Sequence, residues 1–465
     1  MNSAAGPAGP ETPSPPREPR FVPLHAAAAG LDLERYFRWR RAREGDPFRM
    51  RFPGLGSAVF TGSPAGAREV FRAPVELLEP PLPNPIEPMV GAGSLILARG
   101  VRHRNGRTLL MPAFHRARIS AYGSAIRDAA RAEIAGERTG RAWTPGARVD
   151  ARDAARAITL RVILTAVFGI EDPDRRAEYT AATTAFLTAF GGPLFLVPAL
   201  RRRMFGVTGW ERFTAARDRV DALLDGEIAR RRADIDAGAK DAGGQDILGM
   251  LLAARYDDGA PIGDLELREQ LRTLLVAGHE TTATALVWAL YRLHRAPAVL
   301  ERLRAELAAA GPEADPAELA ALPYLDAVCQ ETLRMHPPVP IVLRRLTGDY
   351  ALRGTPVVSG DTMGLSVQLL HSDPEVWPES HLFRPERFLE RRYSPFEFAP
   401  YGGGHRRCVG AALADYELRV VLATVLGAVR LRLAPRFARG RVLLTVPHNI
   451  ALGPRAAITF DIPEP

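Results

Sequence analysis

The sequence predicts a mainly α-helical fold with a smaller β portion, built as a single large domain over residues 21–465. Apolar residues recur with helical spacing through several long stretches, and the longest of these is 263–295. Short strand-like runs bounded by glycine and proline occur in only a few places. No stretch with the composition of a linker divides 21–465, so one domain is expected.

The first 20 residues are expected to form a disordered tail. They hold six prolines among small and polar residues and lack the apolar core of a signal peptide or membrane anchor. Alternating apolar residues then predict a small hairpin over 47–62, and a helical pattern begins at Pro64. The proline-rich stretch 79–98 is predicted to be a long irregular loop, and such loops are often functional.

Helices are predicted over 117–137, 147–169 and 209–237, then over 263–295 and 323–336. The apolar stretch 184–200 is short for a membrane span and is broken by Gly191, Gly192 and Pro193. We therefore expect two helices and a turn that cover an apolar cavity, with a surface patch that touches a membrane as the alternative. Short strands are expected over 339–370 and 441–462, with a helix from Ala411 to about Val429 between them.

Composition excludes several classes of function. Cys329 and Cys408 are the only cysteines and lie in unlike contexts, so no disulfide framework is expected and a reducing cytosol fits. The net charge is +8, and Lys240 is the only lysine, so the positive charge is almost all arginine. Because these arginines are scattered, nucleic-acid binding is not expected, whereas a basic face for an acidic redox protein remains open.

Cys408 is the strongest candidate for chemistry. Gly402, Gly403 and Gly404 precede it and Gly410 follows it, so the backbone can turn tightly and point N–H groups at the sulfur. A helix N-terminus and two neighbouring arginines are expected to favour the thiolate. A thiolate on such a loop suits a soft metal centre, above all haem iron. The alternative is a buried structural cysteine on a glycine-rich turn.

Two helical motifs add to this interpretation. The stretch 277–282 places Glu280 and Thr281 in mid-helix, where the sequence favours a local bulge. A zinc-protease helix is excluded because Ala283 stands where HExxH needs histidine. His103 and Arg107 are four residues apart and could bind one anion together, although such a pair is also typical of a solvated helix face.

Taken in order, four motifs resemble those of the cytochrome P450 family of haem-thiolate monooxygenases. They are the acid–alcohol helix at 277–282, Glu331-x-x-Arg334, Pro-Glu-Arg-Phe at 385–388 and the cysteine loop at 398–410. The resemblance covers essentially all of 21–465. Tyr401 stands where the family usually has phenylalanine, and Arg407 where many members carry a smaller or uncharged residue.

The resemblance implies haem b as cofactor, with Cys408 as the ligand of its iron. Further haem-binding residues implied in this way are His103, Arg107, Ala277, Arg344, Arg406 and Gly410, with Arg345 as the substitute for Arg344 if the correspondence shifts by one. Glu331, Arg334 and Arg387 are implied to form a buried network with a structural role.

The implied activity inserts one oxygen atom from O2 into a hydrophobic substrate, by hydroxylation or epoxidation. Glu280 and Thr281 are implied to be catalytic, because dioxygen activation needs protons that a carboxylate and a hydroxyl can relay. A threonine that merely bonds back to its own helix is the structural alternative. Other functions left open are haem-thiolate chemistry without oxygen insertion, a haem-binding sensor or carrier, and a haem-free structural protein.

A fatty acid or a terpenoid is the expected substrate, since 93–115 is similar to a bacterial subgroup associated with both, and a polyketide remains open. The expected pocket is almost wholly apolar; its candidate residues are Ile86, Leu95, Phe186, Ala277, Val339, Ile341, Val342 and Asn449. No flavin or iron–sulfur domain fits in the chain, so a separate ferredoxin and ferredoxin reductase are expected to supply electrons. We expect a cytoplasmic monomer without a membrane span.

Overall fold

The computed structural model describes residues 22–52, 56–191, 194, 200–202, 208–238, 246–438, 451 and 453–464. The predicted tail over 1–20 lies outside these residues. The helices are α1 (Val22–Leu31), α2 (Leu33–Glu44), α3 (Pro64–Arg72), α4 (Glu87–Val90), α5 (Gly100–Leu110), α6 (Arg116–Ala121), α7 (Gly123–Ile134), α8 (Ala151–Ala166), α9 (Pro173–Ala189), α11 (Gly209–Asp236), α12 (Ile247–Ala253), α13 (Asp264–His294), α14 (Pro297–Ala310), α15 (Pro316–Ala320), α16 (Pro323–Met335), α17 (Val367–Leu370), α18 (Arg387–Glu390), α19 (Ala411–Ala428) and α20 (Pro435–Ala438).

The strands form three small sheets. The largest has the order β1 (Phe48–Phe52), β2 (Gly56–Thr61), β8 (Thr362–Ser366), β5 (Ile341–Leu346) and β3 (Leu78–Glu79), in which only β2 and β8 run parallel. A second sheet has the order β4 (Arg148–Asp150), β10 (Thr459–Asp461) and β9 (Arg432–Leu433), and β6 (Tyr350–Leu352) pairs with β7 (Thr355–Val357). The predicted mainly α fold with a smaller β portion is thus confirmed.

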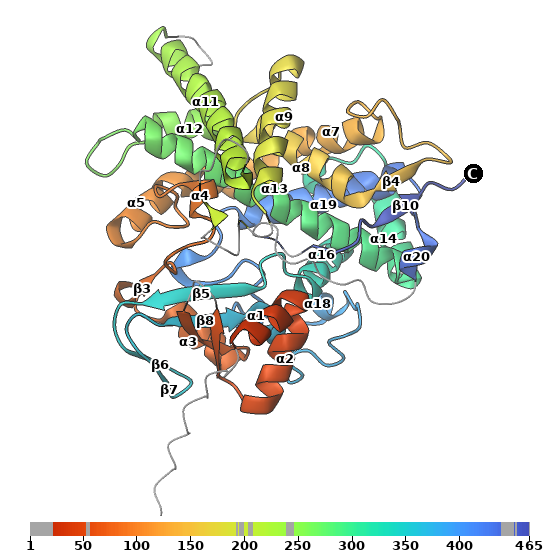
Figure 1. Cartoon of the computed structure of the whole chain (residues 1–465). Coiled ribbons are helices and arrows are strands. Elements are labelled where there is room, and N and C mark those ends of the chain that lie inside the picture. Colours follow the sequence, from red (N-terminus) through yellow and green to blue (C-terminus); the bar gives the residue numbers. More distant parts are fainter. Residues whose placement is uncertain are drawn as a thin grey trace, which may run out of the picture.

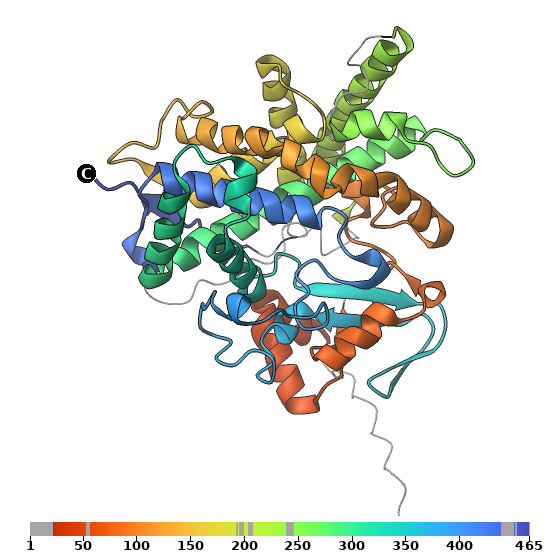
Figure 2. The ribbon, with the colours of Figure 1, turned by 180° about the vertical axis from the view of Figure 1, so that it is seen from behind.

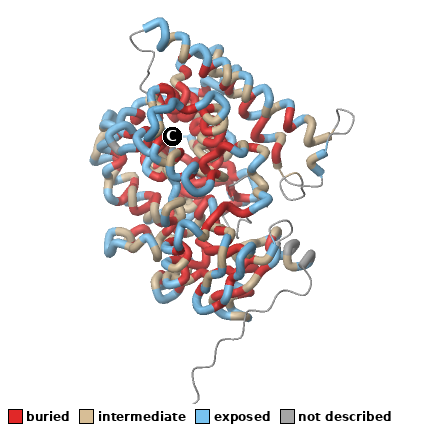
Figure 3. The backbone as a smooth tube through the Cα atoms, turned by 90° about the vertical axis from the view of Figure 1, so that its left-hand side faces the viewer, coloured by how far each residue is buried: buried red, intermediate tan, exposed pale blue. Residues whose placement is uncertain are grey.

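The molecule has a helical part and a sheet part. In Figure 1 the five-stranded sheet lies low with α1, α2 and α3, and the long helices lie above it. The view from behind shows α19 running along the same helical layer (Figure 2). Seen from the side, most of the buried chain gathers inside the helical part (Figure 3).

Helix α13 is the axis of the helical part. It spans 31 residues, packs against α8, α11, α16 and α19, and buries most of its side chains, including Trp288. The prediction of a helix over 263–295 is confirmed, but the expected bulge is wrong: the helix is continuous through 277–282. The Thr281 hydroxyl donates to the Ala277 carbonyl at 2.6 Å, so the hydroxyl is satisfied without any break in the helical hydrogen bonding.

The first hairpin is present as predicted, whereas one predicted helix is divided in two. The hairpin over 47–62 is present as β1 and β2, and the predicted helix over 117–137 is divided at Tyr122 into α6 and α7. Helix α9 covers the start of the apolar stretch 184–200, while 192–193 and 195–199 lie outside the described residues. Among the helices that the structure describes, none is both long and apolar enough to cross a membrane.

Candidate functional site

The cysteine loop 398–410 precedes α19 in the chain and packs in space against the end of α3. Its turn requires glycine. Gly402 and Gly404 have φ values of +65° and +67°, which favour glycine. A Cβ atom at Gly403 or Gly404 would collide with Phe71 of α3. The loop closes because the Cys408 N–H donates to the Tyr401 carbonyl at 3.1 Å. Cys408 is thereby held three residues before Ala411, the first residue of α19.

Cys408 retains accessible surface although protein atoms surround its sulfur. Burial among these atoms is the largest influence on its thiol and raises the pKa. A hydrogen bond from the Gly410 N–H and the charges of Arg407 and Arg107 lower the pKa of this thiol, as expected for a thiolate site. Burial outweighs them, so the neighbouring charges do not by themselves produce a thiolate.

Cys329 has a different environment. It is 2% exposed within the main apolar core, and burial raises the pKa of its thiol strongly. It behaves as a small apolar side chain with no open approach to a ligand.

Basic side chains from three elements converge near the cysteine loop. His103 and Arg107 come from α5, Arg344 from β5, and Arg406 from the turn before Cys408. Burial, followed by the charge of Arg406 and other members of this group, lowers the pKa of His103 to about 4. Burial also lowers the pKa values of Arg344 and Arg406 to about 10.

Within the described residues these guanidinium groups have no carboxylate partner. Arg107, Arg344 and Arg406 donate only to backbone carbonyls, and the buried Nε of Arg406 has no hydrogen bond. Arg345 instead pairs with Glu79. Because buried cations need compensation, the cluster is suited to hold a ligand that carries anionic groups.

His405 belongs to this cluster, although no spacing in the sequence marks it as a ligand-binding residue. Its ring contacts the His103 ring edge to face, with centroids 5.7 Å apart. Burial and the charges of Arg344, Arg406 and Arg107 lower its pKa to about 4. The sequence feature that could have predicted its place in the cluster is its position directly before Arg406 in the cysteine loop.

A polar seam on α13 fixes the segment that leads into α5. Gln270 accepts from the Leu95 N–H at 3.1 Å and donates to the Gly93 carbonyl at 3.0 Å. The Thr273 hydroxyl donates to the Glu269 carbonyl at 2.6 Å and so accepts from the Ser94 hydroxyl at 2.8 Å, and the side chains of Gln270, Thr273 and Ser94 are buried. The same segment supplies the carbonyls of Ile96 and Ala98 to Arg406, so the seam helps to place the cationic cluster.

The predicted acid–alcohol pair lies further along α13. Glu280 is buried and accepts one hydrogen bond from an Arg156 Nη of α8 at 3.0 Å, while Arg156 Nε forms an ion-pair contact with its other oxygen at 2.9 Å. Thr281 bonds back to the Ala277 carbonyl, which is the geometry of the structural alternative. The hydroxyl donates its only proton to that carbonyl, and the lone pairs of its oxygen can still accept a further hydrogen bond.

Glu331, Arg334 and Arg387 form one buried cluster. The Glu331 carboxylate accepts from Arg334 at 2.7 and 2.8 Å and from Arg387 at 3.2 Å. Arg334 also donates to the carbonyls of His371 and Ser380. The cluster joins α16 to the chain that precedes the cysteine loop.

The candidate pocket residues are divided by the structure. Leu95 belongs to the helical core, Ile86 packs against it and Ala277 is half-buried on α13, while Val342 lies beside Gly402 on the same strand face as Arg344. Ile341 points to the other face, against α1 and α2, and Phe186 is wholly buried against Phe213. Val339 is 39% exposed, and Asn449 lies outside the described residues.

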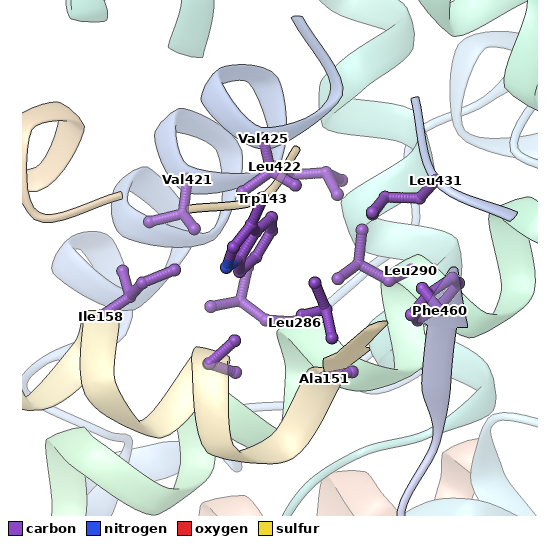
Figure 4. Close-up of a pocket in the computed structure, with 13 residues that line it drawn as sticks. Trp143, Ala151, Ile158, Leu286, Leu290, Val421, Leu422, Val425, Leu431 and Phe460 are labelled. Atoms are coloured by element: carbon purple, nitrogen blue, oxygen red, sulfur yellow. The ribbon is translucent and has the colours of Figure 1, made fainter. Parts of the chain in front are cut away.

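Cavities also occur elsewhere in the part of the chain that the structure describes. One of about 20 Å³ is enclosed by apolar side chains of α8, α13 and α19 with Trp143 and Phe460 (Figure 4). It is barely large enough for one water and offers no polar partner, so it is a packing gap and no substrate site. Another, of about 480 Å³, lies between 83–92, α11 and α13 and is lined by charged residues that include Arg201, Arg217 and Asp221.

Comparisons with known proteins agree with this geometry. A family model described as Cytochrome P450 matches residues 13–445. Cytochrome P450 135B1 of Mycobacterium bovis and of Mycobacterium tuberculosis is 36% identical over 392 residues, which cover 84% of this chain and 79% of that protein. Cytochrome P450 137 of Mycobacterium tuberculosis is 32% identical over 385 residues, which cover 83% of this chain and 77% of that protein.

A solved structure of retinoic acid-bound cyanobacterial CYP120A1 superposes with a TM-score of 0.79 and 25% identity, covering 92% of this chain and 93% of that chain. The likeness extends over the helical part and the sheet part together. The chain therefore belongs to the cytochrome P450 family and is a monooxygenase that uses a cysteine-ligated haem b.

Proposed function

We propose that Cys408 is the haem ligand of a monooxygenase that oxidises a fatty acid or a terpenoid. The observation that carries the assignment is the carboxylate-free cluster of Arg107, Arg344 and Arg406 around the glycine-rich cysteine loop. Of the two cysteines, only Cys408 has accessible surface beside that cluster.

The residues present fit haem b. Its two propionates would supply the negative charge that the guanidinium groups lack, and the orphaned Nε of Arg406 is a donor of the required kind. Glycine at 402–404 lets the backbone approach a flat ring, and the Gly410 N–H already points at the sulfur. Haem, when bound, supplies the iron at which O2 is activated with two electrons and two protons.

Glu280 and Thr281 are proposed to hold and move those protons. Glu280 is buried, but its partner Arg156 has a side chain that is 37% exposed. The pair thus connects the interior of α13 with solvent across α8. Thr281 is the next residue along α13. Its hydroxyl donates to the Ala277 carbonyl, and its oxygen can still accept a hydrogen bond from an ordered water in the proton path.

The substrate class rests on two supports. The candidate pocket residues Ile86, Leu95 and Ala277 carry no charge, and the first two pack in or against the helical core. CYP120A1, the structural relative, was solved with retinoic acid, an isoprenoid with a carboxylate at one end. An apolar molecule with a single acid group is therefore the first substrate to test.

Electrons are proposed to come from a separate ferredoxin and its reductase, with the enzyme acting as a monomer. Arg392 and Arg407 are exposed and lie on or close to the cysteine loop, where they could meet an acidic donor. Arg391 contributes less, because it already pairs with Glu397 at 2.8 Å.

The test is a comparison of matched ligands on the haem-loaded protein. Dodecanoic acid, its methyl ester, retinoic acid and a neutral terpene of similar size are titrated while the Soret band is followed, and product is then measured against electrons consumed with a ferredoxin and reductase. We expect a spin-state shift and coupled turnover with at least one acid or terpene. Binding without substrate-dependent electron use would instead support a haem-binding sensor or carrier.

A further inference from the structure

His371 connects the Glu331–Arg334 cluster to the cysteine loop. It follows α17, is 1% exposed and has a hydrogen bond at each ring nitrogen. Nδ1 lies 3.1 Å from the Arg334 carbonyl, and the Ala399 N–H points at Nε2 from 2.9 Å. The Arg334 side chain in turn donates to the His371 carbonyl at 2.8 Å.

These partners allow only one form of the ring. A backbone N–H can only donate, so Nε2 must carry a lone pair toward Ala399. A carbonyl can only accept, so Nδ1 must carry the proton toward Arg334. The ring is therefore neutral, with its proton on Nδ1, and burial lowers its pKa to about 3 in agreement with this form.

The chain of contacts continues to the sulfur. The Ala399 carbonyl accepts from the Gly402 N–H at 3.0 Å, and the Tyr401 carbonyl accepts from the Cys408 N–H at 3.1 Å. The His371 ring also packs against Phe398, with centroids 5.2 Å apart. Each of these bonds fixes the next residue of the loop, so a shift at His371 reaches the residue that bears the thiol.

We propose that His371 is a positioning residue that ties the cysteine loop to Arg334 and keeps the Cys408 sulfur in place for the haem iron. The proposal goes beyond the assignment of Cys408 as ligand and rests on it. The cluster of Glu331 and Arg334 is anchored in α16, and among the described residues its charged atoms form no hydrogen bond with the cysteine loop 398–410. His371 is the side chain that joins them.

The variants separate the ring's hydrogen bonds from its volume. His371→Leu leaves the buried Ala399 N–H unpaired, whereas His371→Gln restores an acceptor for it. His294→Leu is the control, because the His294 ring lies against the carbonyls of Leu290 and Leu431 and packs on Phe460 of the second sheet, and none of these residues belongs to the cysteine loop. A general loss of stability should affect both leucine variants alike.

The first readout is the carbon-monoxide spectrum of the reduced, haem-loaded proteins. We expect His371→Leu to lose the red-shifted thiolate band at least about tenfold faster than wild type, which corresponds to one buried donor left unpaired. His371→Gln should decay at an intermediate rate and His294→Leu at the wild-type rate. Equal decay in His371→Leu and His294→Leu would overturn the proposal.

The second readout needs neither haem nor a variant. Nitrogen NMR of the wild-type protein should find the proton on Nδ1 of His371, and the Ala399 amide should exchange slowly with solvent. A proton on Nε2 would overturn the proposal, because that nitrogen could not accept from Ala399. Absence of a thiolate band in wild type would instead refute the assignment of Cys408, so the two failures are distinguishable.

Discussion

Removing the charge of Glu331 is the most demanding test of the buried cluster. Its carboxylate is wholly buried and accepts from Arg334 at 2.7 and 2.8 Å, from Arg387 at 3.2 Å and from the Arg384 N–H at 2.9 Å. The two guanidinium groups have side chains that are only 1% and 2% exposed. In Glu331→Gln both would remain charged in the interior without compensation.

The expected cost follows from that geometry. Breaking a buried ion pair by neutralising one partner costs about 3–5 kcal/mol, against a total stability of about 5–15 kcal/mol for an ordinary domain. Glu301→Gln is the control, since Glu301 is 72% exposed and pairs with Arg304 on one helix at 3.2 Å. That exposed pair should be worth less than about 0.5 kcal/mol.

The assay is urea unfolding of both variants and wild type, with far-ultraviolet circular dichroism and the Soret band followed in parallel. We expect Glu331→Gln to unfold at much lower urea and to retain less haem, while Glu301→Gln overlays wild type. If unfolding is irreversible, the comparison is made on unfolding rates. The reasoning is refuted if the two variants have the same midpoint or the same rate.

Three further predictions concern protons. Thr281→Ala should keep haem and substrate binding but divert electrons to peroxide, and an unchanged ratio of product to electrons consumed would contradict the role of this hydroxyl. Arg156→Gln should slow turnover on the order of tenfold and enlarge the solvent isotope effect, because Glu280 loses the guanidinium with which it pairs; unchanged values would separate Arg156 from proton delivery. Burial lowers the pKa values of His279 and His371 to about 4 and about 3, so unfolding takes up protons below pH 6.5 and stability falls as pH drops from 6.5 toward 4. Each histidine should cost about 2 kcal/mol at pH 5, and a urea midpoint that is flat between pH 7 and 5 would contradict this.

Elements with a strong local signal were predictable from the sequence. The periodicity of α13 and the glycine and proline signals around the first hairpin fixed their type and position, because these patterns depend on neighbours along the chain. The cysteine loop was found in the same way. The bulge in α13 was wrongly expected, since helix propensity does not reveal that the Thr281 hydroxyl donates to the Ala277 carbonyl within a continuous helix.

Contacts between distant segments could not be predicted. His371 meets Arg334 and Ala399, which lie 37 and 28 positions away, and no spacing rule brings them together. His405 joins the cationic cluster only because α5 packs beside the loop. Ile341 and Val342 were both expected in the pocket, but alternation along β5 sends them to opposite faces.

The central claim is tested most directly by the carbon-monoxide spectrum of the reduced protein. Wild type, Cys408→Ala and Cys329→Ala are loaded with haem and compared under the same conditions. The account predicts a strongly red-shifted Soret band in wild type and Cys329→Ala and its loss in Cys408→Ala. A red-shifted band that survives in Cys408→Ala, or disappears in Cys329→Ala, would contradict it.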